Sequence, residues 1–528
     1  MLAGGPGSHA SVVSAGAVSR VDHSGRATYS NSTYLYVPKT SEMDRPPDLF
    51  DREQEWDDLV QFATDATTGP RLGVVYGRRR QGKSYLLRHL AEQTNGLYYQ
   101  ALEEERGPTL AGIGRLIAAD TGISGALTYG SWEEAFRALA QRADQARPII
   151  LDEFPYLLAK SPELPSVIQS VFDDARAGQG ASFRLLVCGS AVSVMSELLS
   201  GQKALRGRAS IDLIMKPFDY RQAAAFWRIE DPKLAFLVGA VVGGTPGYRA
   251  LLDGPPPATI DQFDDWLFAG VLNPSHAMFR EADNLLTEDP AISDRALYQS
   301  VLAAIADGHT TRSGVGSLLR REDSALRHPL LVLERAGFIR RDEDLWRARR
   351  PLLRLDDPFL RFHFAVIRRN VPRFETRRTA EAWAESQPAF VAQVLGPHFE
   401  QLARTWTDRF ASIETLGGRP SHVGFTQVND VEERSRVELD VVAVSGNVNA
   451  DRPHVLAVGE AKGGSAALAL VDLRKLERGR TLLAARADTA DARLLLFSRS
   501  GFDPDVVDAA RRRPDIELVD LDRLYGGS

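Results

Sequence analysis

The stretch VVYGRRRQGKS, residues 74–84, decides the fold. An apolar run, RLGVVY at 71–76, stops at Gly77, and the chain crosses three arginines before it reaches Gly82-Lys83-Ser84. This spacing matches the phosphate-binding pattern G-x-x-x-x-G-K-[ST], with a strand expected before it and a helix, SYLLRHLAEQ, after it. We therefore predict a P-loop between the end of a strand and the start of a helix. A chance match in a Gly- and Arg-rich turn is the alternative.

The residue types of this loop suit a triphosphate. Successive backbone N–H groups can wrap the phosphates, and the N-terminus of the following helix adds a favourable field. Gly77, Gln81 and Gly82 are predicted to bind the nucleotide, with Gly82 allowing close approach of the backbone. Lys83 is expected on the β- and γ-phosphates of ATP, and Ser84 on Mg²⁺.

Two further apolar runs are expected to end beside this loop. The run before Asp152 and Glu153 predicts a strand; Asp152 would reach Mg²⁺ through water, and Glu153 would polarise the attacking water. The alternative is an ordinary acidic turn. The run LLVCG leads to Ser190, which either senses the γ-phosphate or caps a helix.

Strands alternating with helices predict an α/β fold with a P-loop NTPase parallel sheet. The runs are unbroken and apolar, as in strands covered on both faces. The expected strands are 71–76, 96–99, 147–152, 183–189 and 210–218. We predict five regions: a disordered tail (1–45), the P-loop ATPase domain (46–225), a helical lid (226–290), a winged helix with linker (291–375) and an α/β restriction-endonuclease-like domain (376–528).

Six motifs in sequence order resemble those of the archaeal-type ATPases, which are AAA-like, STAND-related P-loop proteins: FDREQEW, GRRRQGKS, ILDEFPYL, CGSAVSVM, LRGRA and GGTPGYR. The resemblance covers about residues 48–370. It implies that Arg208 approaches the phosphates as an arginine finger or sensor, from the same or a neighbouring subunit of a homo-oligomer. It also implies that Arg52-Glu53 lies near the base and that Gly244-Thr245-Pro246 contacts the nucleotide. A solvated Arg208 is the alternative.

Residues 295–350 have the size of a winged helix, with three helices and a hairpin, RRDEDLWRARRP. The third helix, with Arg327 and His328, would be the recognition element for DNA. The alternative is a module that only packs between domains. The basic residues that would suit phosphate contact are Arg320, Arg321, Arg340, Arg341, Arg347, Arg349 and Arg350.

A second site is predicted near the C-terminus. Nineteen residues separate Asp440 from Glu460, which opens Glu460-Ala461-Lys462, the spacing of PD-(D/E)XK nucleases. Neighbouring strands would bring Asp440 and Glu460 together as Mg²⁺ ligands, with Glu400 on the preceding helix as a third. Lys462 would orient the attacking water. The ATPase family often carries such a domain, and a degenerate site is the alternative.

Composition narrows the remaining choices. The 528 residues carry a net charge of −6, so total charge does not indicate nucleic-acid binding. One cysteine, Cys188, excludes an intrachain disulfide framework and a Cys-based zinc site. The sequence shows neither a long apolar span nor a secretory signal, and we expect a cytoplasmic protein.

These patterns together predict an ATP- and Mg²⁺-dependent protein that acts on DNA, in which ATP hydrolysis gates a nuclease-like domain. The alternatives are a STAND-like signalling switch and a DNA-binding regulator without nuclease activity.

Overall fold

The structure is a computed structural model that describes residues 43–125, 127–143, 147–201, 203–287, 289–292, 294–347 and 351–528. The predicted tail falls mostly on residues 1–42, outside the described residues, and Arg349 and Arg350 of the predicted basic cluster also lie outside them.

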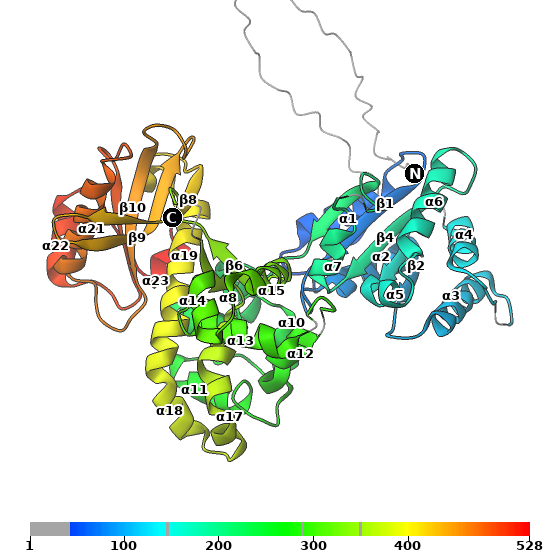
Figure 1. The fold of residues 1–528 in the computed structure, drawn as a ribbon, viewed down its shortest axis with the longest axis horizontal. Coiled ribbons are helices and arrows are strands. Elements are labelled where there is room, and N and C mark those ends of the chain that lie inside the picture. The colour runs from blue at the N-terminus through cyan, green and yellow to red at the C-terminus, as the bar shows by residue number, and fades with distance from the viewer. Residues whose placement is uncertain are drawn as a thin grey trace, which may run out of the picture. The chain divides into compact units, whose positions relative to one another are not determined.

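Five parallel strands form the N-terminal sheet, in the order β2-β3-β4-β1-β5 (Figure 1). Neighbouring residues of a strand point to opposite faces. Val75 therefore packs among side chains of α1 and α2, whereas Val74 packs among side chains of α3 to α7. The elements are α1 (Glu53–Thr64), β1 (Arg71–Tyr76), α2 (Lys83–Thr94), β2 (Leu97–Gln100), α3 (Arg106–Thr121), α4 (Trp132–Arg142), β3 (Ile149–Asp152), α5 (Phe154–Lys160), α6 (Leu164–Arg176), β4 (Arg184–Gly189), α7 (Val192–Glu197) and β5 (Ala209–Ile214).

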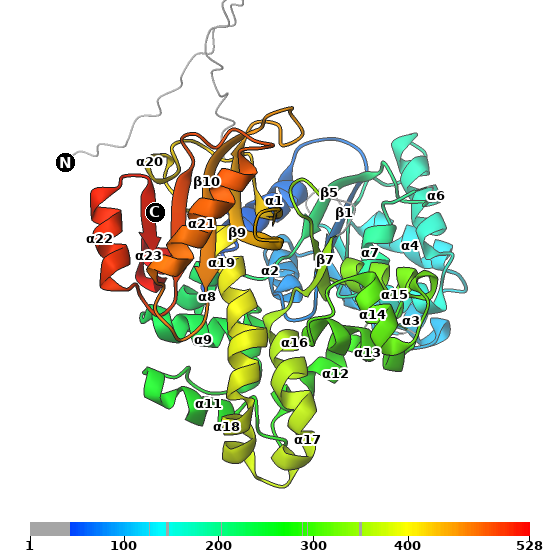
Figure 2. The same cartoon turned by 60° about the vertical axis from the view of Figure 1, so that its left-hand side comes forward.

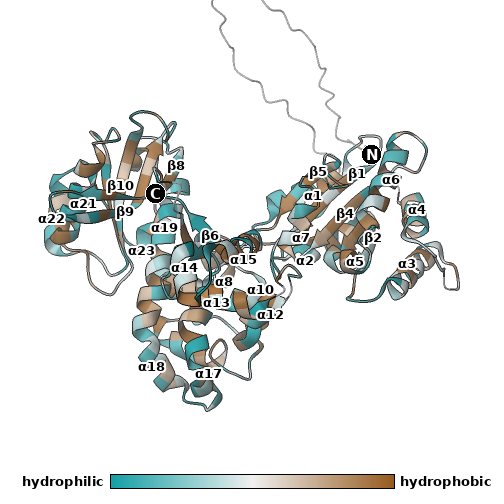
Figure 3. Cartoon of the chain, in the orientation of Figure 1, coloured by the Kyte–Doolittle hydropathy of each residue, from teal (hydrophilic) through white to brown (hydrophobic). Residues whose placement is uncertain are grey.

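The predicted parallel α/β sheet is confirmed, and its strands are among the most hydrophobic parts of this region (Figure 3). One strand end was predicted wrongly. β5 ends at Ile214 and not at 218: Met215 N–H still donates to the carbonyl of Tyr76 at 2.7 Å, but Pro217 has no N–H with which to continue the ladder.

A helical region follows β5. Asp219 caps α8 with a capping box, and Asp231 caps α9, whose first residue is Pro232. Gly243 and Gly244 separate α9 from α10. The elements are α8 (Tyr220–Trp227), α9 (Pro232–Val242), α10 (Gly247–Leu252), η1 (Ile260–Gln262), α11 (Phe263–Ala269), η2 (Ala277–Arg280) and α12 (Glu281–Thr287).

Three helices and a two-stranded antiparallel hairpin come next: α13 (Arg295–Ala306), α14 (Arg312–Leu319), α15 (Asp323–Arg335), β6 (Ile339–Asp342) and β7 (Leu352–Leu355). The predicted hairpin segment, 340–351, was too short. Its second strand begins only after Pro351, because Asp344 and Leu345 leave the hairpin to contact β8 of the C-terminal sheet.

Two helical runs lead to the C-terminal region, and each contains a π-helical segment. The second run reaches from the helical region to the C-terminal sheet (Figures 1 and 2). The elements are α16 (Pro358–Phe362), η3 (His363–Ile367), α17 (Arg368–Glu375), α18 (Thr379–Ala389), η4 (Phe390–Leu395), α19 (Gly396–Arg409) and α20 (Ile413–Leu416).

The C-terminal sheet has the order β12-β11-β10-β9-β8, with β10, β11 and β12 parallel and β8 and β9 antiparallel to their neighbours. Side chains of α19 cover one face and side chains of α21 the other. The elements are β8 (His422–Asp430), β9 (Ser435–Ser445), β10 (His454–Lys462), α21 (Leu470–Leu483), β11 (Arg493–Ser498), α22 (Pro504–Arg512), β12 (Ile516–Val519) and α23 (Leu521–Gly526).

Candidate nucleotide site and a second acidic site

The predicted P-loop joins the carboxyl end of β1 to the N-terminus of α2. Gly77 passes so close to the segment just after β5 that an added Cβ would lie 2.3 Å from the carbonyl oxygen of Met215. Gly82 has φ +90° where it caps α2, a left-handed conformation that side chains rarely adopt. Both glycines are therefore required by the backbone path of the loop.

Lys83 is buried within the loop. Its ammonium group donates to the carbonyl oxygens of Gly77 at 2.7 Å and Arg78 at 2.9 Å. Ser84 follows in the first turn of α2 and is half-buried. The lysine is thus held by neutral main-chain oxygens and not by a carboxylate.

Asp152, Glu153 and Ser190 come together at the carboxyl ends of β3 and β4. Asp152 is fully buried; its carboxylate accepts from the hydroxyl of Tyr98 at 2.5 Å and from the backbone N–H of Glu153 at 2.9 Å. The hydroxyl of Ser190 donates to Glu153 at 3.1 Å. Glu153 has φ +53°, a strained conformation that directs its side chain beside Ser190. The sequence pattern identified these three residues, but it could not predict the contacts between them, because those contacts form only when the strands pair in the sheet.

Cys188, two residues before Ser190, is fully buried in β4. Burial, followed by the charge of Asp152, raises the pKa of its thiol well above the usual value.

Arg208 does not join this cluster in the structure. Its guanidinium forms a two-pronged ion pair with Asp173 on α6, at 2.9 and 2.6 Å, and also donates to the carbonyl of Ala204 at 2.9 Å. The role implied for Arg208 at the phosphates stays a prediction.

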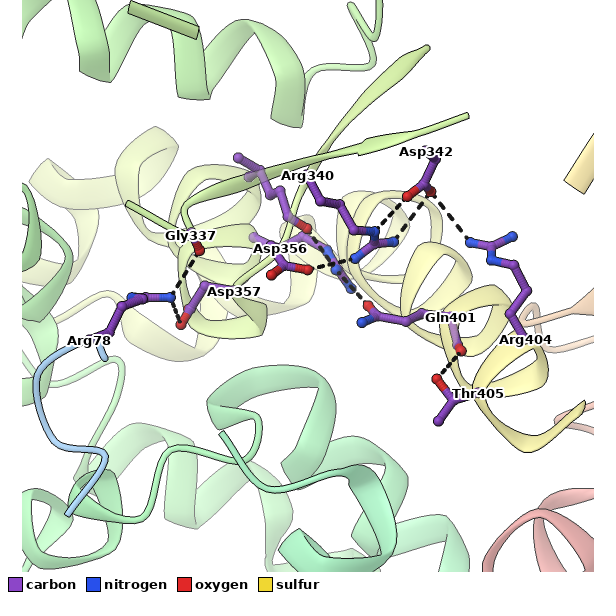
Figure 4. Close-up of polar contacts among 11 residues, drawn as sticks. Arg78, Gly337, Arg340, Asp342, Asp356, Asp357, Gln401, Arg404 and Thr405 are labelled. Atoms are coloured by element: carbon purple, nitrogen blue, oxygen red, sulfur yellow. Dashed lines mark hydrogen bonds and ion pairs between the residues drawn. The ribbon is translucent and has the colours of Figure 1, made fainter. Parts of the chain in front are cut away.

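Contacts of the loop with distant segments were missed by sequence reasoning. Arg78 pairs with the buried carboxylate of Asp357 at 2.8 Å and lies near Gly337 (Figure 4). Arg80 pairs with Glu281, which is 1% exposed, at 2.6 Å. Asp357 caps α16 and Glu281 opens α12, so the arginines of the loop bind the segment after the hairpin and the end of the helical region.

The expected lid segment also contacts the loop. Gln81 donates to the hydroxyl of Thr245 at 3.1 Å, and the N–H of Gly247 donates to the carbonyl of Arg80 at 3.0 Å. A cavity of about 880 Å³ borders this side of the loop and is also lined by Phe218 and Gly244. Its volume lies in the usual range for ligand pockets.

Arg52, implied to lie near the base, stacks over Phe218 at 4.6 Å and donates to the carbonyl of Lys216. It therefore lies beside residues that line the same cavity.

The second predicted site lies where β9 and β10 run side by side. The carboxylate of Asp440 accepts from the N–H of Ala461 at 2.8 Å. Over this stretch Thr426 of β8 pairs with Leu439 and Gly424 pairs with Val442, so β9 holds one residue more than β8. The resulting bulge falls at Asp440 and Val441, and such bulges re-aim side chains.

Several carboxylates face one another around this bulge. Burial, followed by the charges of Glu460 and Glu400, raises the pKa of Asp440 well above its usual value. Burial and then the charge of Glu400 also raise the pKa of Glu438. The acidic residues predicted for this site are therefore close enough to repel one another.

Two lysines neutralise Glu460, which is 4% exposed. Lys462 lies 3.0 Å from its carboxylate and Lys475, on α21, lies 3.2 Å away. Burial alone would lower the pKa of Lys462, but the hydrogen bond and charge of Glu460 raise it. In the described part of the chain, no three His, Cys, Asp or Glu side chains are placed to hold a metal ion together. The predicted metal role of Glu400, Asp440 and Glu460 stays a prediction.

The basic residues around the hairpin separate into two groups. Arg320, Arg321, Arg327 and His328 are exposed. Arg340 pairs with Asp342 at 2.7 Å and Asp356 at 3.1 Å, and Arg341 pairs with Glu334 at 2.7 Å. In the described chain Arg320, Arg321 and Arg327 form no ion pair; Arg327 lies on α15, the predicted recognition helix, and the other two lie just before it.

A family model for an ATPase domain predominantly from Archaea matches residues 49–234. The chain contains an archaeal-type ATPase domain. The P-loop, Asp152, Glu153, Ser190 and Arg208 all lie within the matched residues, and the C-terminal sheet lies outside them.

The chain is also similar to individual proteins. An uncharacterized protein of Methanocaldococcus jannaschii, MJECL04, is 25% identical over 380 residues, which are 71% of this chain and 80% of that protein. The structure of the Walker-type ATPase PABY2304 of Pyrococcus abyssi has a TM-score of 0.46 at 20% identity and covers 61% of this chain and 97% of its own. The structure of the ORC2 protein of Aeropyrum pernix has a TM-score of 0.42 at 16% identity. The match covers 64% of this chain and 97% of the ORC2 chain.

No helix of the described residues is long and apolar enough to cross a membrane.

Proposed function

We propose that the chain hydrolyses ATP at the P-loop and that the nucleotide state gates a nuclease-like site that acts on DNA. The observation that carries the proposal is the Asp152–Glu153–Ser190 cluster at the strand ends beside Lys83. It supplies, in one place, the charges and hydrogen-bond donors that phosphoryl transfer needs.

Each residue of the cluster has a task in hydrolysis. The ammonium group of Lys83 would exchange its two main-chain oxygens for phosphate oxygens, a stronger charge-assisted contact. Glu153 would accept a proton from, or orient, the attacking water, while Ser190 keeps its carboxylate in place. Ser84 and Asp152 would hold Mg²⁺, which would neutralise developing charge on the phosphates.

Coupling to the rest of the chain would run through the arginines of the loop. Arg78 and Arg80 bind Asp357 and Glu281, so a loop that closes on phosphate would pull on both partners. The segment that begins with Asp357 continues through two helical runs to α19, which covers the C-terminal sheet. This supports nucleotide-dependent movement at the second site.

At the second site, Asp440 and Glu460 lie on neighbouring strands, and two carboxylates together with substrate phosphates are a usual Mg²⁺ environment. The ion would supply a Lewis acid and lower the pKa of a bound water. Lys462 would orient that water after leaving Glu460.

The ATPase half is tested by turnover of the Lys83→Ala chain, with Lys160→Ala, an exposed lysine on α5, as the matched control. We expect hydrolysis to be lost in the first variant and kept in the second. Wild-type turnover in Lys83→Ala would contradict the proposal.

The DNA half is tested by cleavage of single- and double-stranded DNA with Mg²⁺, with and without ATP. We expect nicking by the wild type, its loss in Asp440→Asn, and its retention in Asp488→Asn, an exposed control on the same domain. ATP turnover should survive in both variants. A wild-type chain that hydrolyses ATP but never cleaves DNA would reject this half alone.

A signalling switch is the second candidate, and the two lysines on Glu460 favour it. A carboxylate that stays neutralised would not bind a metal ion, and the domain would then serve as a binding platform. This reading predicts ATP-dependent changes in protease sensitivity without DNA cleavage.

A further inference from the structure

A small cavity lined by arginines adjoins the large cavity beside the P-loop, and Arg340 and Arg404 line both. Its volume is about 120 Å³, and it is bordered by the end of α13, β7, α16, η4 and α19. Four arginines line it: Arg340, Arg354, Arg361 and Arg404. Arg340 and Arg404 lie around Asp342 and Asp356 (Figure 4).

Arg361 is the most buried of the four, at 4% exposed. Its guanidinium donates to two neutral oxygens, the carbonyl of Leu355 at 2.9 Å and the side chain of Gln401 at 3.4 Å. Its Nη1 has no hydrogen-bond partner among the described residues. Burying a cation without a hydrogen-bonded anion costs free energy. An anion bound at Nη1 of Arg361 would offset this cost.

Burial, followed by the charge of Arg340, lowers the pKa of Arg361 to about 10. The nearby carboxylates of Asp356 and Asp357 do not offset these effects.

Arg354 gives a second, independent indication that the cavity binds an anion. It lies directly opposite Arg340 in the β6–β7 hairpin, and like charges in facing positions repel. Arg340 is engaged by two carboxylates, whereas the side chain of Arg354 forms no ion pair with any residue that the structure describes. The hairpin thus holds at the cavity a guanidinium with no directly bonded carboxylate, although Asp342 and Glu438 lie near enough for their charges to act on it.

The arginines that line the cavity outnumber its carboxylates by four to two, and the charge of Glu400 acts on Arg404. Asp307 is paired with Arg369, and Glu400 is the other carboxylate at the wall. Gln393, on the π-helical segment η4, has a buried side-chain oxygen without a hydrogen-bond partner among the described residues. Its amide can rotate to present N–H donors to an anion. At about 120 Å³ the cavity has room for one phosphate group.

We propose that this cavity is a binding site for one phosphate group, held by Arg354, Arg361 and Arg404 with Gln393 at its wall. The forked donors of arginine match phosphate oxygens. The group could be carried by a free nucleotide or by a nucleic-acid strand. The site goes beyond the proposed function, although Glu400 borders both the cavity and the second acidic site.

The test uses the full chain with Lys83→Ala, which weakens phosphate binding at the P-loop, and compares variants that share this background. Inorganic phosphate is titrated by calorimetry into this chain and into the same chain with Arg354→Gln. Arg373→Gln, an exposed arginine paired with Glu385 and outside the cavity, is the control. We expect affinity to fall about tenfold or more for Arg354→Gln, since charge-assisted bonds are lost, and to stay unchanged in the control.

Equal affinities of the Arg354→Gln and control chains, or no phosphate binding at all, would overturn the proposal. Arg361→Gln gives the same test for the buried donor, with circular dichroism confirming that the variant folds. Competition then identifies the carrier: displacement of phosphate by dAMP assigns a free nucleotide, and displacement by an oligonucleotide without terminal phosphates assigns a strand. None of these results depends on ATP hydrolysis or DNA cleavage.

Discussion

The two acidic sites use the same residue types in opposite ways. At the N-terminal sheet, Lys83 binds neutral carbonyl oxygens, and in the described chain Asp152 and Glu153 form no ion pair. At the C-terminal sheet, the lysines bind the carboxylate of Glu460 itself. The first arrangement leaves both the cation and the anions available to a nucleotide with its metal ion. The second must break two ion pairs before it can bind a metal ion.

The largest expected effect separates the sites by chemistry. Glu153→Gln should lower ATP turnover by about 10²–10⁴-fold, because a general base is lost, while ATP binding is kept. Turnover is measured by phosphate release and binding by calorimetry. Glu460→Gln should leave turnover unchanged. Equal losses in the two variants would break the distinction between the sites.

The ion pairs around the two sites should also differ in strength. Arg80→Met leaves Glu281 buried without its partner and should lower the free energy of unfolding by about 3–5 kcal/mol. Lys475→Met removes an ion pair of a half-exposed lysine and should cost less than about 1 kcal/mol. Urea unfolding followed by circular dichroism measures both. Adding Glu281→Leu to the Arg80→Met chain should recover most of the lost free energy of unfolding, because no unpaired charge then remains buried.

The helical run between the sites should respond to acid. Burial, followed by the charge of Arg368, lowers the pKa of His363 to about 4. Below pH about 6.5 the histidine therefore binds a proton more readily in the unfolded chain than in the folded chain. The stability that depends on a neutral His363 is fully present above that pH and declines as the pH falls toward 4. From His363 alone we expect a loss of about 2 kcal/mol at pH 5 relative to pH 8. His398, whose pKa burial lowers to about 3, should add to this loss. His363→Phe should remove this part of the pH dependence of the unfolding midpoint.

The smallest expected effect concerns DNA. Arg327→Ala removes an exposed arginine of α15 and should reduce the slope of log affinity against log salt by about one. Arg335→Ala, on the same helix but paired with Glu197, is the control and should change the slope less. Fluorescence anisotropy with a labelled duplex at several salt concentrations measures both. Equal slopes in the two variants would favour a helix that only packs.

How far the sequence predicts each site depends on the range of its contacts. The P-loop is predictable because strand, loop and helix are contiguous and each is specified by local residues. The pairing of Arg78 with Asp357 joins residues 279 positions apart, and no local pattern indicates it. Spacing correctly placed Asp440 and Glu460 on neighbouring strands, but Lys475 reaches Glu460 from a helix that begins eight residues after β10 ends. The strand end before Pro217 could have been predicted from the missing N–H.

The segment between the hairpin strands has a practical consequence for dividing this chain. β8 is the last strand of its sheet, and Leu345 donates to Phe425 at 3.1 Å while Asp344 accepts from Thr426 and Gln427 at 2.9 Å. A fragment that starts at residue 376 would expose this strand, and bare sheet edges recruit other chains. Such a fragment should therefore aggregate more readily than the full chain, and light scattering at equal concentration would show the difference.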